Sequence, residues 1–76
     1  MFEKQEARIA DDLLHSSDAF RRLHDKHHQL DEEVSAATSG RLSLDDHALA
    51  ALKRRKLATR DQMAAMIEAQ KVVAPN

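Results

Sequence analysis

Residues 2–37, FEKQEARIADDLLHSSDAFRRLHDKHHQLDEEVSAA, carry one stripe of positions that recurs at alternating steps of four and three residues. Eight of its eleven positions are apolar, and the stripe consists of Phe2, Glu6, Ile9, Leu13, Ser16, Phe20, Leu23, His27, Leu30, Val34 and Ala37. A spacing near 3.5 residues keeps such positions on one helix face, as in a coiled-coil seam. We therefore predict a helix over residues 2–38 that buries this face against another helix.

The strongest break in the chain follows at residues 38–43, TSGRLS. Gly40 has no Cβ and can adopt the left-handed conformation that ends a helix, while Ser43 can cap the next helix. We place the loop at residues 39–43, a second helix at 44–72 and a frayed tail at 73–76. So short a connection makes the two helices antiparallel neighbours.

The predicted fold is all-α: residues 1–76 form a single domain, an antiparallel two-helix hairpin of coiled-coil type. A lone hairpin leaves one long face of each helix half covered, so we expect pairs of hairpins to assemble into a four-helix bundle. An alternative arises at residues 16–18, Ser-Ser-Asp, which lower helix propensity and offer an internal cap before Phe20. Because the stripe keeps its phase across Ser16, we predict one continuous helix, kinked at most, rather than a separate N-terminal helix.

Composition narrows the class of protein. The chain has 76 residues, no cysteine and 33% charged residues, so it has neither disulfides nor thiolate metal sites. It contains no apolar run near the roughly 20 residues of a membrane span and no signal-peptide pattern, so we expect a cytoplasmic protein. Residues 1–38 carry five Lys/Arg and nine Asp/Glu, whereas residues 39–76 carry seven and four. The two halves have opposite net charge, which favours their packing on each other.

The antiparallel arrangement predicts which residues meet. If the turn centres between Arg41 and Leu42, Phe20 faces Met63 and His27 faces Lys56. His27 is the polar exception in the stripe, and we expect it to accept a hydrogen bond from Lys56 or to pack under its stem, which would fix the helix register. The predicted core and interface residues are Leu13, Phe20, Leu23, His27, Leu30, Val34, Leu49, Leu52, Lys56, Leu57, Met63 and Ile67.

The same register brings residues 31–33, Asp-Glu-Glu, close to residues 53–55, Lys-Arg-Arg. Exposed ion pairs contribute about 0–1 kcal/mol each, so they select the alignment more than they stabilise it. The basic face from Lys53 to Arg60 also resembles a nucleic-acid footprint. It lacks interleaved aromatic residues, however, and the net charge is slightly acidic. We therefore expect an ion-paired, solvated face and do not expect nucleic acid as a partner.

The histidines suggest metal binding, because His24 and His28 stand one helical turn apart with Asp25 and Asp31 nearby. The glutamate of an H-E-x-x-H motif is missing, and no third and fourth ligand follow. We predict solvated histidines and neither a metal nor a cofactor; a metal-responsive protein using His24 and His28 is the weakest alternative.

Nothing in the sequence predicts catalysis. The chain has no glycine-rich phosphate loop and no cysteine nucleophile. A slender hairpin could not exclude water from a Ser–His–acid set. We therefore predict no catalytic residues and no enzyme activity.

Two runs of residues resemble a known family. They are Phe20-x2-Leu23-x3-His27-x2-Leu30-Asp31-x2-Val34 and Leu52-Lys53-x2-Lys56-Leu57-x2-Arg60-Asp61-x-Met63-x3-Ile67. In order and spacing they are similar to the YdcH-like family of small bacterial proteins, over roughly residues 13–67. The resemblance implies a coiled-coil helical hairpin in the bacterial cytoplasm, with these residues as scaffold and interface and with no assigned function.

Two positions depart from the family pattern. Thr59 stands where members often carry an apolar residue, so we expect that layer to be looser or more exposed. His28 stands where asparagine is common, which argues against a family metal site.

The predicted function is a small non-enzymatic helical hairpin that oligomerises and acts as a protein–protein interaction module. We expect its partners to be itself, as a homodimer or higher oligomer, and an unidentified helical protein, with no role for a membrane. The second choice is a nucleic-acid-associated accessory protein that uses the basic face from Lys53 to Arg60.

Overall fold

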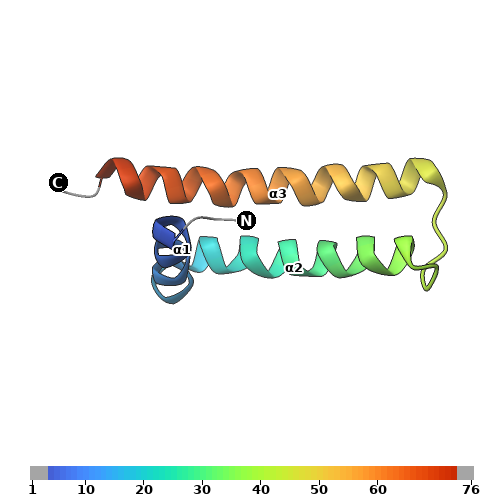
Figure 1. The fold of residues 1–76 in the computed structure, drawn as a ribbon, viewed down its shortest axis with the longest axis horizontal. Helices are drawn as coiled ribbons and strands as arrows, with labels where there is room; N and C mark the ends of the chain where they lie inside the picture. The colour runs from blue at the N-terminus through green and yellow to red at the C-terminus, as the bar shows by residue number, and fades with distance from the viewer. Residues whose placement is uncertain (1–3, 74–76) are drawn as a thin grey trace.

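The structure is a computed structural model that describes residues 4–73. Those residues form three helices and no strand: α1 (Lys4–Ser16), α2 (Asp18–Thr38) and α3 (Asp46–Val73). Helices α2 and α3 lie antiparallel and side by side, and α1 crosses the hairpin at the end remote from the loop (Figure 1). The molecule is elongated, with extents of 49 × 21 × 19 Å. The predicted all-α fold is confirmed, but the two-helix hairpin is wrong because there are three helices.

Ser17 divides the predicted first helix into two. Its backbone is extended, with φ −124° and ψ 114°, and its hydroxyl accepts a hydrogen bond of 3.1 Å from the Phe20 amide. Arg21 donates to the Leu14 carbonyl at 2.9 Å and pairs with Asp18, which ties the end of α1 to the start of α2. The prediction of one continuous helix is therefore wrong: a serine side chain satisfies the first amides of α2, so the chain can turn there.

The turn at Ser17 builds the core. Leu13 of α1, Phe20 of α2, and Met63 and Ile67 of α3 form one buried cluster, and Phe20 and Ile67 are almost completely enclosed. Partly buried apolar residues surround the cluster: Ile9, Ala10, Leu14, Leu23 and Met66. The largest apolar side chains therefore gather where the three helices meet, and Leu30 is buried further along the hairpin.

The loop begins as predicted but ends two residues later. Gly40 has a φ of +86°, the left-handed conformation that its missing side chain permits. At the other end, Asp45 rather than Ser43 caps α3, because its carboxylate accepts the Ala48 amide at 2.7 Å. A charged acceptor at a helix N-terminus is stronger than a neutral hydroxyl. The second helix therefore starts at Asp46, not at residue 44, and its last described residue is Val73. Phe2 and the predicted tail at 74–76 lie outside the described residues.

Thr59 corrects another expectation. Thr59 is only 3% exposed, and its hydroxyl donates to the Arg55 carbonyl of its own helix at 2.8 Å. A threonine can therefore occupy a tight layer between α2 and α3, because the helix itself satisfies its polar atom. The prediction of a looser or more exposed layer is wrong.

We expect Ser17→Ala to lower the free energy of unfolding by about 1 kcal/mol, because it removes the side-chain cap of α2. Urea denaturation followed by circular dichroism would measure the change. Ser16→Ala is the matched control and should stay within about 0.5 kcal/mol of the unchanged protein, since Ser16 is exposed and only donates to Asp12 of its own helix. Equal effects of the two substitutions would contradict this role of Ser17.

Candidate functional site

A shallow groove of about 300 Å³ lies between α2 and α3, near the middle of the hairpin. Two residues of α2 and four of α3 line it: His27, Val34, Lys53, Lys56, Leu57 and Arg60. Spacings of three or four residues along α3 place its four members on neighbouring turns of one side. The groove thus combines an apolar surface with three cationic side chains.

Leu57 is the most exposed large apolar side chain of the described residues. It was predicted to lie in the core or an interface, yet 54% of it is open to solvent. Its neighbour in the groove, Val34, is half-buried. Leu57 is therefore not a core residue of the single chain.

His27 contributes an unsatisfied polar atom to the groove. Its Nε2 is buried and has no hydrogen-bond partner among the described residues. Burial lowers the pKa of His27 below its ordinary value of 6.5, and the positive charge of Lys56 lowers it further. Since water is withheld from Nε2, the neutral form of His27 is favoured in the folded state.

Lys56 pairs with Asp31 instead of His27. Its ammonium lies 2.5 Å from the Asp31 carboxylate, with Lys56 33% and Asp31 52% exposed. The hydrogen bond from Lys56 and its positive charge hold the pKa of Asp31 below its usual 3.8. Of the two predicted contacts between Lys56 and His27, the hydrogen bond is therefore wrong: the carboxylate is the stronger acceptor, and a flexible lysine stem can reach it.

We predicted an ion-paired basic face, but apart from Lys56 its side chains form no ion pair among the described residues. Lys53, Arg54, Arg55 and Arg60 are exposed, and none pairs with a carboxylate within residues 4–73. The α2–α3 groove is consequently bordered by positive charges that remain available.

The two candidate metal ligands, His24 and His28, each contact a different carboxylate. His24 Nδ1 lies 3.5 Å from Asp25, and His28 Nε2 lies 3.5 Å from Glu32. Across residues 4–73, no three His, Asp or Glu side chains gather as a metal site would require. His24 and His28 therefore form separate surface pairs with carboxylates.

The other predicted core and interface residues divide by burial. Leu13, Phe20, Leu30, Met63 and Ile67 are buried, whereas the half-buried members are Leu23, Leu49 and Leu52, together with His27, Val34 and Lys56. The structure thus brings most of the predicted residues to the α2–α3 contact.

A second ion pair between helices, besides that of Lys56 and Asp31, was also not predicted. Lys71 near the end of α3 donates to Glu6 of α1 at 2.8 Å, and both side chains are 23% exposed. This hydrogen bond raises the pKa of Lys71 above 10.5, so its contribution to stability is lost only as the pH rises through that higher pKa. Glu6 occupies a stripe position, and this was the signal available in the sequence.

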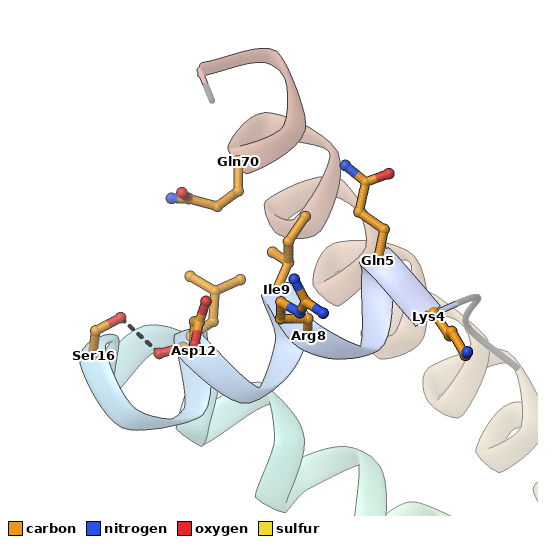
Figure 2. Close-up of a pocket in the computed structure, with 8 residues that line it drawn as sticks. Lys4, Gln5, Arg8, Ile9, Asp12, Ser16 and Gln70 are labelled. Atoms are coloured by element: carbon orange, nitrogen blue, oxygen red, sulfur yellow. Dashed lines mark hydrogen bonds between the residues drawn. The ribbon is translucent and has the colours of Figure 1, made fainter. Parts of the chain in front are cut away.

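A second hollow, of about 510 Å³, lies between α1 and the C-terminal part of α3, and its lining residues are drawn in Figure 2. Arg8, Asp12 and Ser16 line it from α1, and Gln70 lies across from them on α3. Its one internal hydrogen bond runs from the Ser16 hydroxyl to the Asp12 carbonyl at 2.9 Å. These polar groups lie where α1 packs against α3, and they include no nucleophile–base pair.

The fold and the groove together define a class of protein: small helical hairpins that present a mixed apolar and basic face. Within residues 4–73, no helix is long and apolar enough to cross a membrane. Residues 20–67, 48 of the 76, match the family described as protein of unknown function DUF465, the YdcH-like family of small bacterial proteins. The chain belongs to this family, which confirms the resemblance seen in its sequence. Neither the curated proteins nor the solved structures contain a match.

We expect His27→Leu to raise the free energy of unfolding by about 1 kcal/mol near neutral pH, because it removes a buried polar atom that has no partner. The gain should grow as the pH falls. A lowered pKa means that the folded protein binds this proton more weakly, so the unchanged chain loses stability from about pH 6.5 down through the lower folded pKa.

Urea denaturation of both proteins between about pH 7.5 and pH 5 would test this expectation. His28→Leu is the matched control: His28 is 69% exposed, so the change should fall within about 0.5 kcal/mol at neutral pH. Parallel pH profiles for the unchanged chain and His27→Leu would contradict the role given to His27.

Proposed function

We propose that this protein is a non-enzymatic helical module that associates with itself through the exposed side of its α2–α3 hairpin. The observation that carries the proposal is Leu57, a large apolar side chain in the middle of α3 that is 54% exposed and borders the groove. Two further exposed large apolar residues, Leu42 and Leu44, lie at the loop end of the same hairpin. Burial of such side chains is the main favourable term in association.

The size of the chain supports the same proposal. Only five apolar residues are buried within residues 4–71: Leu13, Phe20, Leu30, Met63 and Ile67. Domains of this length bury a small fraction of their surface and are often completed by oligomerisation. A second hairpin laid on the first would form a four-helix bundle, with the apolar stripe of each hairpin covered.

We expect the protein to sediment as a dimer or higher oligomer at micromolar concentrations and its melting temperature to rise with protein concentration. Leu57→Glu should weaken association about tenfold or more, because it places a carboxylate where apolar surface is buried. Analytical ultracentrifugation would measure both.

Ala58→Glu is the matched control, because Ala58 is exposed on the same helix and the charge change is identical. It should leave association unchanged. A monomer at all concentrations, with circular dichroism of a fully folded helical protein, would contradict self-association and point instead to a different protein as partner.

A second candidate function is favoured by the unpaired cations of α3. Lys53, Arg54, Arg55 and Arg60 are exposed without carboxylate partners in the described part of the chain, so they could neutralise phosphates of a nucleic acid. If they do, fluorescence anisotropy with a labelled duplex should give binding that weakens steeply with salt and that Arg54→Ala/Arg55→Ala reduces. Absence of binding at low salt would eliminate this candidate.

A further inference from the structure

A second stripe of residues runs along α3 and is not used by the core. Asp46, Ala50, Lys53, Leu57 and Arg60 recur at steps of four, three, four and three residues. That spacing gathers them on one side of the helix, and we call them the α3 seam. Ala50 is half-buried, and the other four residues are exposed. The α3 seam thus has the periodicity of a helix-pairing surface and stays open in the single chain.

The α3 seam is complementary to itself when two copies run in opposite directions. Asp46 and Arg60 stand seven residues before and after Lys53, while Ala50 and Leu57 stand three before and four after it. A two-fold axis beside Lys53 brings Asp46 of each copy to Arg60 of the other, and Leu57 of each to Ala50 of the other. Parallel packing would instead set Asp46 against Asp46 and Arg60 against Arg60, which is repulsive.

We propose that the α3 seam is the surface through which this protein binds a second copy of itself, with the two α3 helices antiparallel. The inference rests on the self-association proposed above and adds its surface and orientation. The small side chain of Ala50 leaves room for Leu57 of the other copy, so the most exposed large apolar residue becomes buried. Such isologous contacts close at two copies.

Charge favours a second copy as the occupant. The α3 seam supplies both signs, acidic at Asp46 and basic at Arg60, so each copy provides what the other lacks. Arginine–carboxylate pairs at the ends of the contact can form two parallel hydrogen bonds each. Lys53 meets its counterpart near the axis, and this is the one repulsive contact; its long stem lets the ammonium turn out to water.

The test exchanges charges between the two ends of the α3 seam. Asp46→Arg alone and Arg60→Asp alone should each weaken the dimer about tenfold or more, because each chain then sets like charges together twice. An equimolar mixture of the two variants should form a heterodimer, since both ends then regain opposite charges. Native mass spectrometry would measure the amounts of homodimer and heterodimer. Lys53→Gln, made in the otherwise unchanged sequence, should strengthen the dimer because it removes the repulsion between the two Lys53 side chains.

Arg55→Asp is the matched control: it makes the same change in net charge from the opposite side of α3 and should leave the dimer intact. Circular dichroism of each variant separates loss of association from loss of folding. If the unchanged chain dimerises but both charge variants remain dimers, or their mixture gives no preferred heterodimer, the α3 seam is not the interface and self-association uses another surface. If the unchanged chain is a folded monomer throughout, both proposals fail.

Discussion

The hydrogen bond from the Phe20 amide to the Ser17 hydroxyl is the constraint on which the rest of this structure depends. It lets the backbone leave the helical conformation at one residue, so α1 can fold against α3 instead of extending beyond the hairpin. Helix α3 is seven residues longer than α2, and α1 covers the part that projects. The buried cluster around Phe20 and the pair between Glu6 and Lys71 both follow from that turn.

The periodicity of the sequence predicted which residues are buried, but not the direction of the chain at Ser17, which one local hydrogen bond determines. A stripe that keeps its phase fits a straight helix and a bent pair equally well, because phase says nothing about direction in space. The buried residues Leu13, Phe20, Leu30, Met63 and Ile67 were therefore all predicted, whereas the break at Ser17 was named only as the alternative to one continuous helix. The left-handed conformation of Gly40 was predicted correctly, because a residue without a Cβ adopts it readily at the end of a helix. Asp45 was missed because Ser43, two residues earlier, also fits a helix cap, and the charge of Asp45 makes it the better one.

The candidate site was harder to predict than the fold. The helical register fixes where each side chain leaves the backbone. The side chain of Lys56 is long enough to reach several acceptors, however, and it pairs with Asp31. His27 is consequently left with a buried nitrogen that lacks a partner, and a stripe position does not reveal that. Leu57 shows the same limit: its spacing predicts an apolar contact, but spacing alone does not say whether that contact lies inside the chain or between chains.

The position of α1 gives this small molecule a polarity. Family membership rests on residues 20–67, which lie in the hairpin, yet Leu13 of α1 closes the core at one end of it. Among the described residues, the large apolar side chains that stay exposed are Leu42, Leu44 and Leu57, and all lie toward the loop or midway along the hairpin. Within the part of the chain that the structure describes, α1 thus covers one end of the hairpin, and the exposed large apolar side chains lie at the other end or midway along it. If the protein associates with itself as proposed above, the two copies would meet along the loop-proximal half of α3, and the α1 helix of each copy would lie outside the contact.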